Sequence, residues 1–350
     1  MLLVRNIRLP LTCPDPDAEA AAKALAILRV PARKAAHCGV AKLSVDARHG
    51  APVLVYTIAV TLKDEGEESA LAGASPCVCF TQPPAFTFPR GKMPLAHRPV
   101  VVGLGPAGLF AALLLARSGY RPLVLERGPA LDERIRAVSH FEKTGELDPN
   151  ANIQFGEGGA GTFSDGKLNT GTKNPAHRLI LETFVEAGAP RDILWDAKPH
   201  IGSDILPTVV TAISQRIEQL GGVVRYRTKL VDIRIDASGA ITGIDVQSSQ
   251  DAAYESIETK HLILACGHSA RDIFELLKDH NVTLAQKTFA MGVRPSPIRS
   301  LGGTSCPRSS PLQARRPSSQ RPQRVLVLHV PRRAGCRRLF RAGPPVRQRR

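Results

Sequence analysis

A strand–turn–helix motif, RPVVVGLGPAGLFAALLLARSGYRPLVLERG, constrains the fold of this chain more than any other feature. The run PVVV at residues 99–102, with three successive β-branched valines, is typical of a buried parallel strand, and the apolar helical pattern of residues 107–118 comes after the turn. The turn between them is Gly103-x-Gly105-x-x-Gly108. This order predicts an α/β unit whose first turn binds a dinucleotide. The alternative is a glycine turn in an unrelated α/β unit.

Each glycine of the turn has a separate expected role. Gly103 allows the tight bend, Gly105 removes a side chain where a pyrophosphate approaches the backbone, and Gly108 lets helix and strand pack closely. The helix N-terminus attracts anions through its free N–H groups and its dipole. We therefore expect the three glycines, with Pro106 and Ala107, to contact the pyrophosphate.

An acidic residue follows the second predicted strand. Residues 121–125, RPLVL, are expected to form this strand, and Glu126 follows it, 23 residues after Gly103. A carboxylate there can accept hydrogen bonds from both ribose hydroxyls and would repel a 2′-phosphate. Arg127 is a further expected cofactor contact. The alternative for Glu126 is an exposed carboxylate at a strand end.

The remaining organisation predicts several units. Residues 1–70 suggest a small α+β domain, and residues 71–98 a Pro-rich linker. The Rossmann-type unit starts at residue 99, and a second strand with a glycine turn, at 261–272, comes about 160 residues after the first turn. This spacing favours an FAD-binding domain of the glutathione-reductase type over a single-domain NAD dehydrogenase. We expect residues 99–294 to form that domain, interrupted by a long α+β insertion and incomplete.

A second glycine-rich segment, NIQFGEGGAGTFSDGKLNTGT, lies inside the expected insertion. One interpretation is that this segment brings its backbone close to the phosphate or the flavin of a cofactor. The alternative is an irregular surface loop. Leu230 presents backbone atoms to adenine or is an ordinary strand residue. The further cofactor-binding candidates are Gly158, Gly159, Gly161, Ser164, Asp165, Leu230, Ala265 and Gly267.

The sequence assigns no acid–base pair and no metal site. His200 and His268 each lie beside a glycine-containing turn, where a histidine carries protons or simply bonds to backbone. The seven cysteines have neither zinc-ligand spacing nor a redox CxxC. We interpret them as buried or incidental thiols.

The basic character of the chain belongs to one segment. The formal charge is +16, but residues 295–350 hold fourteen arginines and no acidic residue, whereas the other 294 residues carry 33 basic and 31 acidic side chains. This Arg/Pro/Ser-rich tail is a disordered tail, a nucleic-acid-binding arm or an out-of-frame translation. Codons permitted for residues 325–341, shifted by one nucleotide, encode YSFCMCPGGLVVVGSS, which favours the frameshift.

Five segments together resemble a family of predicted FAD-dependent dehydrogenases, the NAD(P)/FAD-dependent oxidoreductases. These are the fingerprint, NIQFGEGGAGTFSDGKL, AKPHIGSD, LACGHSARD and FAMGVR. The resemblance covers about residues 1–294, including the small N-terminal unit. It implies FAD as cofactor, with NAD(P)H as electron donor or acceptor. The family continues through a CMCPGG segment, which the shifted frame recovers.

The expected function is therefore that of a cytoplasmic FAD-dependent oxidoreductase acting on a small molecule that the sequence does not specify. Arg5 and Arg8 interrupt the N-terminal apolar run, so no signal peptide is expected, and no apolar run is long enough for a membrane span. The first alternative is a nucleotide-binding protein without turnover. The second is nucleic-acid binding through the basic tail. The oligomeric state is left open.

Overall fold

The computed structural model describes residues 1–48, 50–73, 75–82, 86, 88, 91, 94–164, 166–168 and 174–285. The basic tail at 295–350 and the candidate Asp165 lie outside the described residues. Within the described part, no helix combines the length and apolarity needed to cross a membrane.

The N-terminal region is an antiparallel sheet packed against one helix. Its elements are β1 (Leu2–Pro10), α1 (Pro16–Leu28), a 3₁₀ turn η1 (Ala32–Lys34), β2 (Ala35–Asp46), β3 (Val53–Leu62), α2 (Glu65–Leu71) and β4 (Val78–Phe80), with strand order β2-β3-β1-β4. Asp15 caps α1 by accepting a hydrogen bond from the Ala18 N–H. Ala20, Ala24 and Leu28 repeat every four residues, so one face of α1 is buried on the sheet.

Part of the segment expected to be a linker belongs to this sheet. Residues 78–80 form β4, which pairs with β1 through Leu2 opposite Phe80 and Val4 opposite Val78. A three-residue strand is too short for an alternating pattern to identify it. The extended conformation of residues 78–80 therefore depends on their pairing with β1.

The second sheet is parallel and confirms the predicted α/β class. It contains β5 (Val100–Val102), β6 (Leu123–Leu125), β7 (Val223–Arg225) and β11 (Leu262–Leu264) in the order β11-β5-β6-β7. The helix α3 (Pro106–Arg117) connects β5 to β6. Because the chain places β6 on one side of β5 and β11 on the other, a crevice is expected at the carboxyl end of β5.

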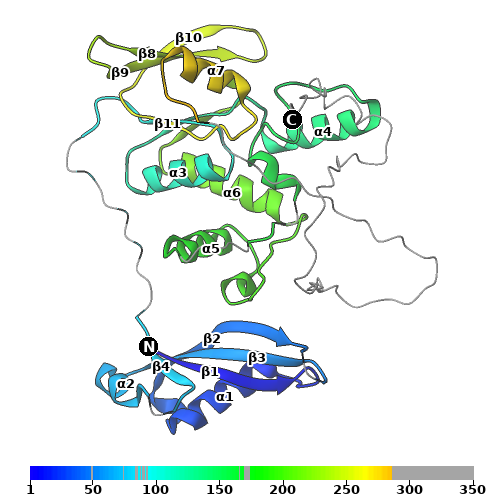
Figure 1. Cartoon of the computed structure of the whole chain (residues 1–350), viewed down its shortest axis with the longest axis vertical. Coiled ribbons are helices and arrows are strands. Elements are labelled where there is room, and N and C mark those ends of the chain that lie inside the picture. The colour runs from blue at the N-terminus through cyan, green and yellow to red at the C-terminus, as the bar shows by residue number, and fades with distance from the viewer. Residues whose placement is uncertain are drawn as a thin grey trace, which may run out of the picture.

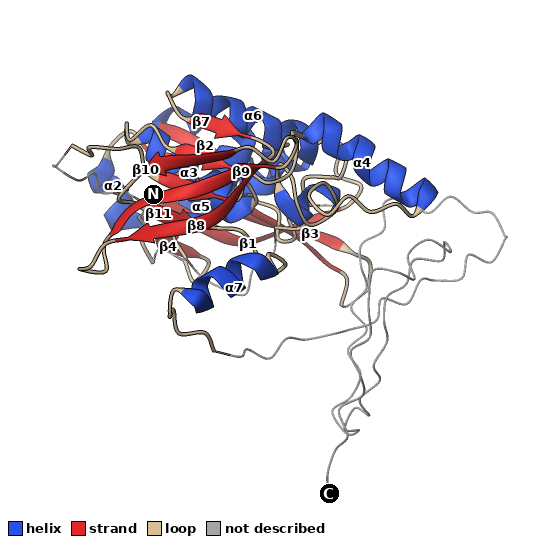
Figure 2. Cartoon of the chain, turned by 90° about the horizontal axis from the view of Figure 1, so that it is seen from above, coloured by secondary structure: helices blue, strands red, loops and turns tan. Residues whose placement is uncertain are grey.

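The two faces of the parallel sheet are covered by different layers (Figures 1 and 2). Val101 and Val124 point to α3 and α6 (Leu206–Gln219), whereas Val100 and Val102 face the opposite layer. That layer contains β8 (Thr228–Ile235), β9 (Ile241–Ser248), β10 (Tyr254–Glu258) and α7 (Arg271–Asp279), and its sheet has the order β10-β9-β8. The sequence did not predict β10, because the only apolar aliphatic residue in YESIE is Ile257.

The chain between β6 and β7 carries the remaining helices: α4 (Leu131–Thr144), η2 (Gly159–Phe163), α5 (Ala176–Glu186), η3 (Arg191–Leu194) and α6. This segment also contacts the N-terminal sheet. The Leu43 N–H donates to the Trp195 carbonyl at 2.8 Å, and the Ala197 N–H donates to the Leu43 carbonyl at 2.9 Å.

Candidate nucleotide site

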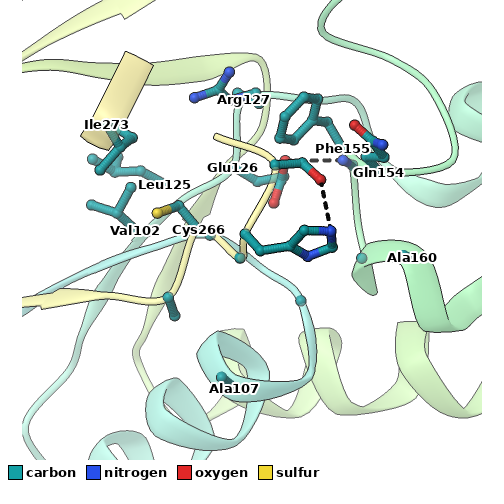
Figure 3. Close-up of a pocket in the computed structure, with 18 of the residues that line it drawn as sticks. Val102, Ala107, Leu125, Glu126, Arg127, Gln154, Phe155, Ala160, Cys266 and Ile273 are labelled. Atoms are coloured by element: carbon teal, nitrogen blue, oxygen red, sulfur yellow. Dashed lines mark hydrogen bonds between the residues drawn. The ribbon is translucent and has the colours of Figure 1, made fainter. Parts of the chain in front are cut away.

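A cavity of about 410 Å³ lies at the carboxyl end of β5, within the roughly 300–1,000 Å³ common for ligand pockets. Figure 3 shows side chains from several distant segments around it. They come from the turn after β5, the end of β6, the loop before η2, η2 itself, the start of β8 and the turn after β11. The tertiary structure thus assembles this site from segments that are separate in the sequence.

The turn after β5 is held by both neighbouring strands. The Gly103 N–H donates to the Leu125 carbonyl at 2.7 Å, and the Ala265 N–H donates to the Val102 carbonyl at 2.8 Å. Gly103 has φ +99°, and a Cβ there would lie 2.6 Å from the Ala265 carbonyl oxygen. The conformation and the close contact together exclude a side chain at this position.

Helix α3 begins at this turn without a side-chain cap. Gly105 is the N-cap residue, and Pro106 occupies the first turn of the helix. Both residues line the cavity, as does Ala107. The positive end of the helix dipole therefore faces a space that can accept an anion.

The second glycine-rich segment meets the first. A Cβ on Gly159 would lie 2.9 Å from the Gly105 Cα, and the Gly158 N–H donates to the Leu104 carbonyl at 2.9 Å. Gly159, Ala160 and Gly161 line the cavity. Backbone from two distant segments therefore forms one wall of the cavity.

Glu126 is buried at the junction of three segments, with 4% of its surface exposed. Its Oε2 accepts a hydrogen bond from the Leu104 N–H at 2.8 Å. Its Oε1 accepts from the Gly128 N–H at 2.9 Å and the Gly156 N–H at 3.0 Å. Glu126 is buried and lines the cavity, so it is not the exposed strand-end residue of the alternative interpretation.

A charged cluster borders the same end of the cavity. The Arg127 guanidinium donates to both carboxylate oxygens of Asp272 at 2.9 Å and lies 4.4 Å from the centre of the Phe155 ring. Lys229 forms a second ion pair with Asp272 at 2.9 Å. Burial raises the pKa of Asp272, but the hydrogen bonds from Lys229 and Arg127 outweigh it and lower the pKa overall.

Most predicted cofactor-binding residues line this cavity. They are Gly103, Gly105, Pro106, Ala107, Glu126, Arg127, Gly159, Gly161, Leu230, Ala265 and Gly267. Gly108 lies behind the turn, where a Cβ would collide with the Gly103 carbonyl oxygen. This agrees with the packing role expected for Gly108, which does not line the cavity. The roles of the lining residues in binding a cofactor remain predictions.

Gly158 and Ser164 line a neighbouring cavity of about 610 Å³. This second cavity is largely apolar and is bordered by α3, α5 and α6, with Phe110 packed edge-on against Phe184 at 5.4 Å between ring centres. Pro106, Ala107 and Gly161 line both cavities, so the two adjoin. Lys167 also lines the second cavity.

The two candidate histidines occupy different places. His268 lines the first cavity and is exposed, with its ring 3.5 Å from the Ser269 hydroxyl. His200 is exposed and pairs by backbone with Lys167. Cys266 also lines the first cavity, and burial raises the pKa of its thiol.

The sequence interpretation missed Arg134, Gln154, Phe155 and Glu157. Arg134 and Glu157 are buried around the loop before η2, whereas Gln154 and Phe155 line the cavity. One indication was available for Arg134. It occupies the buried stripe of α4 with Leu131, Val138 and Phe141, where an apolar residue would be expected.

Comparison with known proteins gives two partial relatives. No family model matches the chain. An uncharacterized protein of Clostridium beijerinckii is 46% identical over 204 residues, which cover 58% of this chain and 37% of the relative. The aklavinone 12-hydroxylase RdmE of Streptomyces purpurascens is 28% identical over 178 residues, or 48% and 32% of the two chains. The chain thus spans about a third of the length of the curated relatives it matches.

Solved structures resemble the chain only distantly. THI4 of Thermovibrio ammonificans superposes with a TM-score of 0.34 and 18% identity, covering 53% of this chain and 64% of that chain. The glycerol-3-phosphate dehydrogenase of Bacillus halodurans, complexed with FAD, superposes with a TM-score of 0.32 and 13% identity, covering 51% and 36%. We therefore base the function on the geometry of the cavity.

Proposed function

We propose that the 410 Å³ cavity binds the adenosine diphosphate part of FAD and that the chain is part of an FAD-dependent oxidoreductase. One observation carries this proposal. The uncapped start of α3, the buried Glu126 carboxylate and the backbone of Gly159–Gly161 surround a single cavity. These groups match a pyrophosphate, a ribose and a close backbone approach, respectively.

The residues around the cavity suggest how the cofactor is held. The turn at residues 103–107 would bind the pyrophosphate, and Glu126 would accept a hydrogen bond from the ribose. Phe155 and Leu230 offer apolar surface for adenine at the same end. A buried carboxylate disfavours a 2′-phosphate, so FAD or NAD is expected to bind better than NADP.

Two features favour FAD over NAD. The second glycine-rich segment supplies a further wall that a simple NAD domain lacks, and it lies in a long segment between β6 and β7. The sequence also resembles FAD-dependent dehydrogenases. When bound, FAD supplies the electron-transfer chemistry, with NAD(P)H as a proposed donor or acceptor, whereas the protein binds and orients it.

Titration of the purified chain with FAD, ADP and NADP tests the proposal. We expect saturable binding of FAD and ADP by calorimetry, weaker binding of NADP, and a yellow complex that bleaches when a reductant is added. Absence of binding by both FAD and ADP, or a preference for NADP, would contradict the proposal. A bound flavin that no reductant can bleach would instead favour a binding protein without turnover.

A further inference from the structure

We propose that Arg134 is a positioning residue of the nucleotide site: it fixes the loop at residues 152–157 so that the Gly156 N–H orients the Glu126 carboxylate toward the ribose. This inference rests on the proposed function, because it concerns how the chain presents Glu126 to the nucleotide. It assigns a role to a buried arginine that lies outside the fingerprint.

Arg134 makes an unusual set of contacts for a buried cation. Its side chain is fully buried within the described structure, and its Nε donates to the Asn152 carbonyl at 3.0 Å. Its Nη1 donates to the Glu157 carbonyl at 2.5 Å and its Nη2 to the Ile153 carbonyl at 2.8 Å. One rigid guanidinium therefore binds both ends of the loop, which the point-like ammonium of lysine cannot do with the same geometry.

Electrostatics hold the guanidinium in place. Burial lowers the pKa of Arg134 to about 10, while the nearby carboxylates of Glu126 and Glu157 oppose this shift. The side chain therefore remains a cation at neutral pH. Its guanidinium also lies 4.8 Å from the centre of the Phe163 ring, which adds a contact from η2.

Arg134 also shapes the backbone at Gly156. This glycine has φ +119°, and a Cβ on it would collide with the Arg134 Cδ. The loop backbone therefore packs directly on the arginine stem, and the Gly156 N–H points to the Glu126 Oε1 at 3.0 Å. Arg134 thus acts on Glu126 through Gly156.

The consequence for Glu126 follows from its acceptor positions. Oε1 accepts from two backbone N–H groups, those of Gly128 and Gly156, and Oε2 accepts from one, that of Leu104. A carboxylate oxygen has two lone pairs, so Oε2 keeps one acceptor position. If the loop shifts, the carboxylate can rotate and its alignment with a ribose hydroxyl is lost.

The test compares ADP with 2′-deoxy-ADP in the wild type, in Arg134→Lys and in Arg136→Lys. Arg136 is a matched control because it is exposed on the same helix. Loss of one hydrogen bond to a charged group should weaken 2′-deoxy-ADP binding to the wild type by about tenfold or more. The measured quantity is the ratio of the ADP affinity to the 2′-deoxy-ADP affinity. In Arg134→Lys we expect this ratio to fall toward one, whereas in Arg136→Lys we expect it to keep the wild-type value.

The ratio separates positioning from a general loss of stability. A variant that is merely less stable binds both nucleotides more weakly by the same factor, so its ratio does not change. Calorimetry is done at a temperature at which circular dichroism shows each variant folded. An unchanged ratio in Arg134→Lys would overturn the proposal, whereas a wild type that does not bind ADP would contradict the proposed function instead.

A second variant covers the case in which Arg134→Lys does not fold. Gly156→Ala disturbs the same contact from the loop side. It must lower the ADP to 2′-deoxy-ADP ratio as well, and retention of the wild-type ratio there would equally overturn the proposal.

Discussion

Two segments that meet at the cavity, the turn at residues 103–108 and the loop at residues 152–157, are held in different ways. The turn at residues 103–108 is fixed by strand neighbours, since Gly103 bonds to the end of β6 and packs on Ala265 after β11. The loop at residues 152–157 is fixed by side chains. Arg134 binds three of its carbonyls, and Asn152 Oδ1 accepts from the Gln154 N–H at 2.8 Å.

The difference teaches which glycine patterns can be interpreted from sequence. A turn whose shape follows from secondary structure carries its own signature, because strand, turn and helix are adjacent in the chain. A loop whose shape depends on a distant arginine carries no such signature. Glu126 joins the two segments by accepting from Leu104 in one and Gly156 in the other.

The largest expected effect tests the first segment. In Gly108→Ala the new methyl meets the Gly103 carbonyl oxygen, which is backbone and cannot move aside. We expect the free energy of unfolding to fall by about 3 kcal/mol, measured by urea denaturation. Gly105→Ala is the control, because its Cβ would meet only the Gly159 Cα, at 3.8 Å.

For Gly105→Ala we expect a stability change within about 1 kcal/mol but an ADP affinity lowered by about tenfold, since the methyl enters the cavity wall. If Gly105→Ala destabilised the protein more than Gly108→Ala, the assignment of packing to Gly108 and ligand approach to Gly105 would be wrong.

The next effect tests the link between the segments. Glu126→Gln replaces an acceptor oxygen by an NH₂ group, so at least one buried backbone N–H loses its partner. We expect a loss of about 2 kcal/mol in unfolding free energy and weaker ADP binding by calorimetry. Glu142→Gln, an exposed change on α4, should leave both unchanged. Equal unfolding free energies and ADP affinities in the two variants would argue against Glu126 as the link between the two segments.

A smaller, local effect is expected in the second segment. Gly156→Ala introduces strain at φ +119° and presses on Arg134, which should cost about 1–2 kcal/mol. Hydrogen exchange should increase in peptides covering residues 150–157 and stay unchanged in α3. A uniform increase over both regions would show that the loop is not held independently of the turn.

The smallest effect concerns Asp272 and depends on pH. Its pKa is lowered in the folded chain, because the hydrogen bonds from Lys229 and Arg127 outweigh burial. The unfolded chain therefore binds the proton more readily, and the stabilisation is present above about pH 4. It is lost as the pH falls through the lower folded value.

Asp272→Asn should accordingly reduce stability at pH 7 by up to about 1 kcal/mol and flatten the loss of stability below about pH 4. Thermal unfolding across this range measures both. Asp279→Asn, on the exposed side of α7, is the control. Identical acid profiles for wild type and Asp272→Asn would rule out this contribution.

Much of the fold could be predicted because its signals are local. The helix expected at 107–118 is α3 at Pro106–Arg117. Strands without a clear alternation of apolar and polar residues were harder to predict from the sequence. For β4, residues 78–80 were expected to belong to a linker, but they pair with β1.

The residues of the candidate site also fall into those that could be predicted from the sequence and those that could not. Gly103, Gly105 and Glu126 could be found because motif and spacing mark them in the sequence. For Arg134 the one indication was its place in the apolar stripe of α4, and its partners are carbonyls of a distant loop. Phe155 could not be singled out, because its role depends on the Arg127 side chain that packs on it. The close packing of Gly108 was expected from the sequence, but only the structure shows that this residue does not line the cavity.

The sequence by itself determined the α/β class, the parallel strand with its glycine turn and the acidic residue at the end of the next strand, because each depends on neighbours along the chain. Only the tertiary structure decided that the loop before η2 closes the cavity and that Arg134 holds this loop. The physical reason is that a buried cation and the carbonyls it binds lie 18 to 23 residues apart, and only packing brings them together.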